Sequence, residues 1–228
     1  ETLYVPMLIP EINASHLQLI KYQRKNHFSK GGFIVVKPNC SLQTYAAPVY
    51  ALMNAGHKVS KVDVVTLQAC SGAGERGIRS LDPITVGLRL YNMIKSHNFD
   101  SALAETLVNR TRTSIEGLID IVDNVIPHIR GEVDKTQDEP LKIFGKIRKG
   151  EIVKYNNIKI SAQCTRVPVT DGHMACVKLK FRSKTKPSID EIIQIWRKFR
   201  GLPQDYGLHS APKHPIIYMN EEDRPQTK

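Results

Sequence analysis

The stretch FIVVKPNCSLQTYAAPVYALMNAG, residues 33–56, predicts a strand that leads directly into a helix. Phe33–Val36 all favour strands, and the sequence Lys-Pro-Asn that follows interrupts them. The segment after Cys40 has the composition of a helix, in which Pro48 predicts a kink or an early break. Gly56 suits the position after the helix, because glycine adopts the left-handed conformation found there. These residues predict a strand-to-helix unit at the centre of the fold.

Cys40 stands at the predicted start of this helix. The unpaired N–H groups and the dipole at a helix N-terminus stabilise a thiolate, which is the nucleophilic form of cysteine. This position therefore favours a catalytic nucleophile. The alternative is a small buried hydrophobic residue, which is the more common role of cysteine.

A second predicted strand ends in a glycine-rich turn. Residues 58–69, KVSKVDVVTLQA, alternate between apolar and polar side chains, which is typical of a strand. The turn Ser71-Gly72-Ala73-Gly74 follows directly. Glycine allows a ligand to approach the backbone closely, and successive N–H groups in such a turn can bind an anion. Turns of small residues are also ordinary connections, so this turn alone identifies no ligand.

Two helices have clear start signals. Near the N-terminus, Asn13 or Ser15 is a suitable N-cap for a helix of about three turns. Near the C-terminus, SIDEIIQIWRKFRG predicts a helix in which Ser188 and Glu191 form a capping box, with Gly201 at its end.

The remaining elements predict the fold class. Residues 82–126 show mostly helical periodicity, and a charged segment then leads to a short helix near Lys142. From residue 151 onward the pattern changes to strands, with a turn at 170–172. Strands and helices without regular βαβ alternation predict an α+β domain with a mixed sheet and flanking helices.

Composition limits the possible partners. The 228 residues carry a formal net charge of +11, and 41% of them are hydrophobic, which is enough to form a core. The basic residues are spread out without interleaved aromatic residues, so we expect no nucleic-acid partner. We find no run of about 18 apolar residues and no signal-peptide pattern, so we expect a soluble, cytoplasmic chain without a membrane partner.

The cysteines predict neither a disulfide framework nor a metal site. Cys40, Cys70, Cys164 and Cys176 lie far apart, and the sequence has no CxxC pair and no histidine grouping at metal-ligand spacing.

Five motifs in order resemble aspartate-β-semialdehyde dehydrogenase in its archaeal and fungal-type branch. They are PNCS at 38–41, LQACSGAG at 67–74, DNVIPHIRGEVDKTQDEPLKI at 123–143, RVPVTDGHMACV at 166–177 and EEDRPQ at 221–226. The resemblance covers nearly the whole chain except about residues 79–119.

The resemblance implies that β-aspartyl phosphate is reduced by NADPH to aspartate semialdehyde, with release of phosphate, in lysine, threonine and methionine biosynthesis. Cys40 matches the family's nucleophile, His173 its general acid/base, and Gln68 the residue that orients the intermediate. A thioester formed at a cysteine accepts hydride where a carboxylate would not. Without the family, His173 would be an ordinary polar residue at a strand start, and Gln68 an amide bonded to backbone.

The resemblance also implies substrate and cofactor contacts. Arg166 matches the residue that binds the substrate carboxylate, and Glu139 the one that binds its amino group. Lys142 and Asn39 match phosphate contacts, and Ser71–Gly74 a cofactor contact. The alternative for Glu139 and Lys142, which are three residues apart, is an ordinary surface ion pair. A homodimer or homotetramer is implied as well.

The sequence departs from the family pattern in two places. Only 39 residues precede Cys40, and they contain no GxGxxG turn. We therefore expect residues 1–39 to be the end of a nucleotide-binding domain, 40–212 the catalytic and dimerisation domain, and 213–228 a segment returning to the first domain. We also expect poor NADP binding by this chain alone. Residues 79–119 are the second departure, a predicted helical insertion.

Two other functions remain open. An acyl-CoA reductase of the same superfamily, such as malonyl-CoA reductase, would share the cysteine and histidine chemistry, although Glu139 favours a substrate that carries an amino group. A non-catalytic dimerisation or interaction homologue is the other alternative.

Overall fold

The computed structural model describes residues 4–28, 30–81, 87, 119–182 and 186–227. The chain forms two compact units. The first unit contains Glu1–Thr66, Arg130–Gln163 and Ala175–Gln226, and the second contains Leu67–Ile129, Cys164–Met174 and Thr227–Lys228. We describe each unit by itself.

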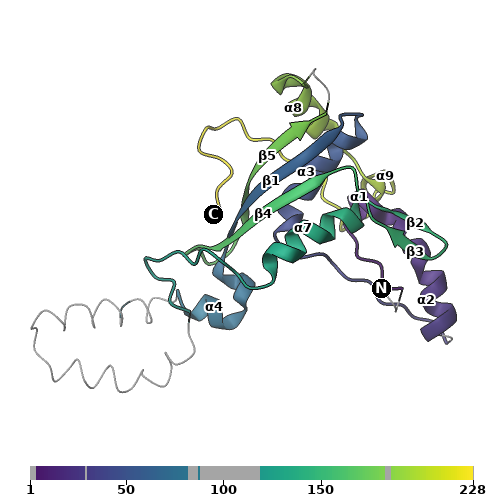
Figure 1. The fold of residues 1–228 in the computed structure, drawn as a ribbon, viewed down its shortest axis with the longest axis horizontal. Helices are drawn as coiled ribbons and strands as arrows, with labels where there is room; N and C mark the ends of the chain where they lie inside the picture. The colour runs from purple at the N-terminus through teal and green to yellow at the C-terminus, as the bar shows by residue number, and fades with distance from the viewer. Residues whose placement is uncertain (1–3, 29, 82–86, 88–118, 183–185, 228) are drawn as a thin grey trace, which may run out of the picture. The chain divides into compact units, whose positions relative to one another are not determined.

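A three-stranded sheet forms the centre of the first unit. Its strand order is β4-β1-β5, where β1 is Val59–Gln68, β4 is Lys159–Arg166 and β5 is Met174–Phe181 (Figure 1). The predicted strand at 58–69 is confirmed as β1. From Val62 onward every second side chain of β1 is buried, because one face of the strand packs on the core.

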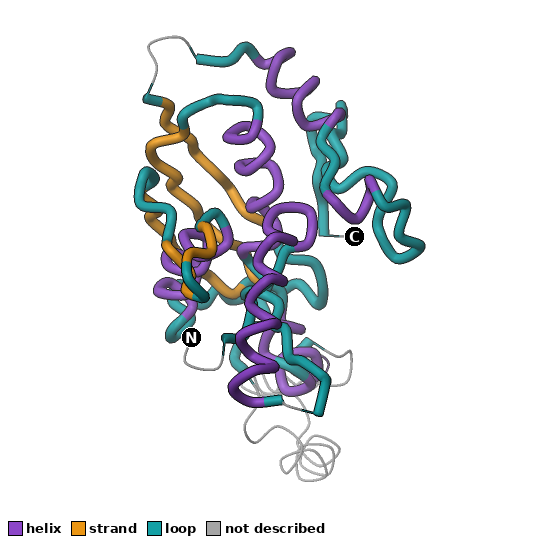
Figure 2. The backbone as a smooth tube through the Cα atoms, turned by 90° about the vertical axis from the view of Figure 1, so that its right-hand side faces the viewer, coloured by secondary structure: helices purple, strands orange, loops and turns teal. Residues whose placement is uncertain are grey.

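Helices α3 (Leu42–Asn54) and α7 (Glu132–Ile143) pack against this sheet. Their contact with β1 forms the main core, whose fully buried members include Leu42, Ala46, Leu52, Val62 and Ile143. The prediction of an early break at Pro48 is wrong, since α3 runs on through it to Asn54. Helix α7 is longer than the short helix expected near Lys142. With β1, β4 and β5, these helices confirm the predicted α+β class (Figure 2).

The predicted strand at 33–36 is wrong. A single parallel bridge joins Met7 to Val36, and Phe33 is 51% exposed. A strand needs a continuous ladder of hydrogen bonds to a neighbour. In the part of the chain that the structure describes, Val36 bonds only to Pro6 and Leu8, so no ladder forms here.

The N-terminal helical stretch starts earlier than predicted. It consists of α1 (Pro10–Asn13), η1 (Ala14–Gln18) and α2 (Leu19–His27). Asn13 holds the N-cap position of η1, as predicted, but its side chain makes no capping bond there. Its side chain accepts a bond from the Ile9 N–H and donates to the Met7 carbonyl and to His16.

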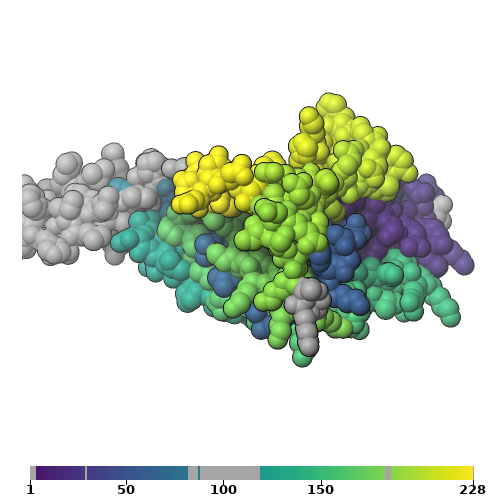
Figure 3. All heavy atoms as spheres, turned by 90° about the horizontal axis from the view of Figure 1, so that it is seen from above, coloured from purple at the N-terminus to yellow at the C-terminus, as the bar shows by residue number. Residues whose placement is uncertain are grey.

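The other elements of the first unit lie toward the chain's C-terminal half. A hairpin joins β2 (Lys146–Arg148) to β3 (Glu151–Val153), and α8 (Ile189–Lys198) is followed by α9 (Leu202–Asp205). Ser188 caps α8, since its hydroxyl accepts from the Glu191 N–H, which is one of the two bonds of the predicted capping box. Gly201 does not end α8. It is the N-cap residue of α9, and its Cα lies so close to Glu11 that a Cβ would clash. The chain beyond residue 205 lies mostly on the surface, drawn yellow-green to yellow in Figure 3.

The second unit contains η2 (Cys70–Ala73), α4 (Glu75–Arg79) and the loop at 119–129. The helices predicted over 82–126, and most of the predicted insertion at 79–119, lie outside the described residues. Residues 119–126 are described and are not helical, so that end of the prediction is wrong. Here Ile121 is fully buried as part of a loop.

Among the described residues, no helix is long and apolar enough to cross a membrane, and no cluster of His, Cys, Asp and Glu could hold a metal. All four cysteines are free thiols.

Candidate active site

The predicted site residues divide between the two units. Asn39, Cys40, Glu139 and Lys142 belong to the first unit, and Gln68, Ser71–Gly74, Arg166 and His173 belong to the second. Within each unit the structure brings several of them together. We name the first group the cysteine cluster and the second group the arginine–histidine cluster.

The cysteine cluster is built on the start of α3. The Asn39 side-chain oxygen accepts a 2.8 Å hydrogen bond from the Leu42 N–H, three residues further on. This bond gives a side-chain partner to the N–H of the first residue of α3, which has no partner within the helix. Cys40 follows Asn39 directly and is half-buried, in the turn that leads into α3, whose first residue is Leu42.

Helix α7 brings Glu139 to the same place. Its carboxylate accepts a 2.7 Å bond from the backbone N–H of Asn39, 100 residues away in the sequence. Glu139 thus contacts the backbone of the residue that directly precedes Cys40. The same bond places the negative charge of Glu139 at the N-terminal end of α3, where the helix dipole favours it.

Lys142 forms an ion pair with Asp138, whose carboxylate oxygen lies 3.3 Å from the lysine nitrogen. Asp138 also accepts from Lys154. The bond from Lys154 lowers the pKa of Asp138, and the bond from Lys142 acts in the same direction.

Lys135 is a member of the cysteine cluster that the sequence did not reveal. It bonds to Glu132 at 3.0 Å, and this bond raises the pKa of Lys135. The negative charge of Glu139 acts in the same direction. The spacing from Lys135 to Glu139 is the four-residue spacing of one helix face, which was the available signal.

Two buried polar atoms of this cluster have no hydrogen-bond partner within the part of the chain that the structure describes. They are Nδ2 of Asn39 and the hydroxyl oxygen of Ser41. A buried donor without a partner costs about 1–3 kcal/mol. Such an atom beside Cys40 fits a ligand that accepts a hydrogen bond from it.

The arginine–histidine cluster lies around Ala69 in the second unit. The Arg166 guanidinium donates to the Ala69 carbonyl at 2.6 Å, and the Ala69 N–H donates to Nδ1 of His173 at 2.9 Å. Because Nδ1 accepts, the neutral ring carries its proton on Nε2. Arg166 is only 6% exposed. The backbone of Ala69 therefore holds the side chains of both Arg166 and His173.

Gln68 and Cys70 flank Ala69. Gln68 is buried, and its backbone carbonyl accepts from the Val167 N–H. Burial raises the pKa of the Cys70 thiol, which the nearby Arg166 charge partly opposes. Cys70 is therefore held as a neutral thiol, unlike a nucleophile.

The turn Ser71–Gly74 is a poor anion cradle. The N–H groups of Ser71, Gly72 and Gly74 donate to the carbonyls of Thr170, Ala69 and Ser71. The space beside the Gly74 Cα is open, whereas a Cβ on Gly72 would meet Arg166 and His173. This turn fits close approach by a ligand at Gly74 better than binding of a phosphate.

Comparison with protein families identifies this arrangement. Residues 49–228 match the family described as semialdehyde dehydrogenase, dimerisation domain. The chain belongs to this family. Cys40 lies before the matched residues, while the arginine–histidine cluster and α7 lie within them.

Relatives extend the semialdehyde dehydrogenase match to the N-terminal residues. Aspartate-semialdehyde dehydrogenase of Aspergillus fumigatus is 35% identical over 226 residues, and that of Methanothermobacter thermautotrophicus is 34% identical over 224. Each alignment covers 98% of this chain and 52% of the relative. The chain thus spans about half the length of the curated relatives that it matches.

Solved structures agree with this assignment. The crystal structure of aspartate semialdehyde dehydrogenase with NADP from Candida albicans has a TM-score of 0.70 and 31% identity, covering 98% of this chain and 52% of that one. Aspartate semialdehyde dehydrogenase II from Vibrio cholerae, at 21% identity and a TM-score of 0.60, covers 86% of this chain and 49% of that one, and shares the fold.

Proposed function

We propose that this chain is the catalytic and dimerisation portion of an NADP-dependent aspartate-semialdehyde dehydrogenase, a cytoplasmic enzyme of aspartate-family amino-acid biosynthesis. In this proposal residues 40–212 form the catalytic and dimerisation domain of a homodimer or homotetramer. Residues 1–39 and 213–228 connect it to a nucleotide-binding domain. The observation that supports the proposal is the bond from the Asn39 N–H to Glu139, because it joins α7 to the residue directly before Cys40.

The acylation step uses the cysteine cluster. The Cys40 thiolate attacks the carbonyl carbon of β-aspartyl phosphate, a carbon–sulfur bond forms, and the carbon–oxygen bond to phosphate breaks. Glu139 binds the substrate's ammonium group. Lys142 and the unpartnered Nδ2 of Asn39 bind the phosphate as it leaves. The ammonium group of Lys135 offsets the negative charge that gathers there.

The arginine–histidine cluster serves the other half of the substrate. Arg166 binds the substrate carboxylate with a planar guanidinium that suits bidentate pairing. His173, held by its Nδ1 bond to the Ala69 N–H, presents Nε2 for proton transfer to and from the tetrahedral intermediates. Gln68 orients these intermediates.

The chain's own residues fit only part of the cofactor. NADPH, when bound, supplies the hydride that reduces the thioester to the aldehyde. The open space at Gly74 allows the Ser71–Gly74 turn to contact the reacting end of the cofactor. Because the N–H groups of Ser71, Gly72 and Gly74 are already bonded, the cofactor phosphates require residues outside this turn.

Acylation tests this proposal without the cofactor. We expect β-aspartyl phosphate to add one aspartyl group to Cys40, detected by peptide mass mapping, with release of an equal amount of phosphate. Cys40→Ala should abolish both signals, whereas Cys176→Ala, at an exposed thiol, should keep them. Malonyl-CoA should give no adduct, and a malonyl adduct would support the acyl-CoA reductase instead. Equal labelling of the Cys40→Ala variant would contradict the proposal.

A further inference from the structure

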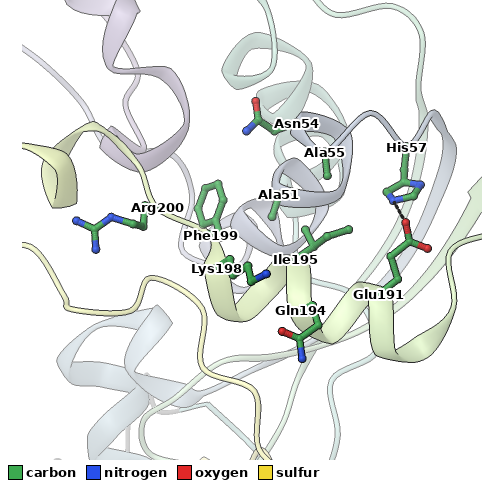
Figure 4. Close-up of a pocket in the computed structure, with 10 residues that line it drawn as sticks. All are labelled: Ala51, Asn54, Ala55, His57, Glu191, Gln194, Ile195, Lys198, Phe199 and Arg200. Carbon is green, nitrogen blue, oxygen red and sulfur yellow. Dashed lines mark ion pairs between the residues drawn. The ribbon is translucent and has the colours of Figure 1, made fainter.

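A cavity of about 520 Å³ lies between α3 and α8, away from the cysteine cluster (Figure 4). It lies beside the C-terminal end of α3, whereas Asn39 and Cys40 lie at the start of this helix. A helix of 13 residues is about 20 Å long, so the cavity is separate from the nucleophile. Its volume falls in the range of about 300–1,000 Å³ that small-molecule sites occupy.

The cavity has an apolar floor that other contacts hold in place. Ala51 of α3 and Ala55, which directly follows this helix, contribute to it, together with Ile195 of α8 and the Phe199 ring (Figure 4). Trp196 donates from Nε1 to the Pro48 carbonyl at 3.0 Å, which attaches α8 to α3. The floor is therefore preformed, and it suits an aliphatic chain.

Opposite charges lie at the two ends of this floor. At one end Nε2 of His57 lies 3.3 Å from the carboxylate of Glu191, where the chain leaves the partially negative C-terminus of α3. At the other end is Lys198. Seven residues of α8 separate Glu191 from Lys198, or about 10 Å along the helix.

Arg200 does not add a second cation to the floor. Its side chain points away from the other lining residues (Figure 4). The guanidinium donates to the Gln204 carbonyl at 2.8 Å and lies 3.4 Å from the Asp205 carboxylate. Lys198 is thus the positive charge beside Ile195, and Glu191 the negative charge at the far end.

We propose that this cavity binds an elongated zwitterion, namely an ω-amino carboxylate or a basic amino acid. The ammonium group binds the Glu191 carboxylate, the ligand carboxylate binds Lys198, and the methylenes lie on the apolar floor. A pure anion would be repelled at Glu191 and a pure cation at Lys198. Asn54 and Gln194 line the cavity as further hydrogen-bonding groups. This inference does not depend on the proposed function.

Calorimetric titration of the chain tests this proposal. The probe is ε-aminocaproate, with lysine as the amino-acid probe and with hexanoate and hexylamine as single-charge controls. We expect saturable binding of the two zwitterions and weaker binding of both controls. Lys198→Met and Glu191→Gln should each weaken ε-aminocaproate binding about tenfold, as expected for a lost charge-assisted bond. Lys25→Met and Glu151→Gln, at exposed positions on α2 and β3, are the matched controls and should bind like the parent.

Other results would overturn the proposal. Hexanoate binding as tightly as ε-aminocaproate would show a simple anion site, and the absence of saturable heat with all four probes would show no site. Binding that neither charge substitution weakens would place the ligand elsewhere. Ala55→Leu keeps both charges and fills the floor, so it should weaken the binding of both zwitterions. This variant tests the cavity even if a charge variant folds poorly. Unchanged binding in Ala55→Leu would likewise count against the cavity.

Discussion

Gly72 is the residue on which the geometry of the arginine–histidine cluster depends most directly. A Cβ at this position would lie 2.7 Å from Nη1 of Arg166 and 3.2 Å from Cε1 of His173. Arg166 is buried and bonded to Ala69, so it has little room to move. We expect Gly72→Ala to lower the free energy of unfolding by about 1–3 kcal/mol through overpacking. Urea unfolding measures this, with Ser71→Ala as a control in the same turn, and an unchanged midpoint would contradict the close contact.

His16 makes a second residue-scale prediction, on pH. Its Nε2 lies 3.1 Å from the Gly145 carbonyl and its Nδ1 lies 3.1 Å from the Asn13 amide nitrogen, so the neutral ring has both partners. Burial lowers the pKa of His16 below its ordinary value of 6.5, and the Gly145 bond only partly opposes this. The unfolded chain therefore takes up the proton at higher pH than the folded chain. Stability from the neutral ring is present above the unfolded value and is lost as pH falls through the folded value.

We therefore expect the urea concentration at the unfolding midpoint to decrease as the pH is lowered from about 7.5 to about 5.5. In His16→Gln this fall should be smaller, although the variant should be less stable by about 1–3 kcal/mol at the higher pH, because a buried partner is lost. His209→Gln, at an exposed histidine, should behave like the parent. Equal pH dependence in His16→Gln and the parent would show that another group is responsible.

At the scale of elements, Asn39 has two separable parts. Its oxygen caps α3 by accepting from the Leu42 N–H, while its buried Nδ2 has no partner among the described residues. Asn39→Ala should destabilise the chain by about 1 kcal/mol, because the cap is lost. Asn39→Asp keeps the cap oxygen and removes the donor. Asn39→Asp should therefore unfold at a urea concentration near the parent midpoint, but it should no longer be acylated by β-aspartyl phosphate. If Asn39→Asp were as unstable as Asn39→Ala, the Asn39 oxygen would not stabilise the start of α3.

The elements also show what the sequence could predict. The caps and periodicity of α8 and the alternation of β1 are local, and both elements were predicted. The buried face of α7 consists of Thr136, Pro140 and Ile143, and the first two are not residues that mark an apolar stripe, so most of this helix was missed. The strand expected at 33–36 depends on a neighbouring strand, which local composition cannot supply.

The candidate site shows the same limit. The position of Cys40 directly before α3 follows from its neighbours in the sequence. The bond between Asn39 and Glu139 spans 100 residues, and no spacing rule predicts it. The resemblance to a family identified Glu139, whereas Lys135 emerged only from its electrostatic interactions with Glu139 and Cys40 in the folded chain.

At the scale of the whole molecule, β1 and β4 each contribute residues to both units. Unfolding of one unit must therefore disrupt strands of the other, and we expect one cooperative transition in urea. The single tryptophan, Trp196, reports on the first unit through its fluorescence. The buried thiols of Cys70 and Cys164 report on the second through alkylation.

The two midpoints should coincide. The exposed thiol of Cys176 should react at every urea concentration, which checks that the reagent itself is unaffected by urea. Short pulses of alkylation, followed by peptide mass mapping, distinguish the four thiols. If Cys70 and Cys164 became reactive at a lower urea concentration than the fluorescence transition, the second unit would unfold independently. The shared strands would then not couple the arginine–histidine cluster to the cysteine cluster in stability.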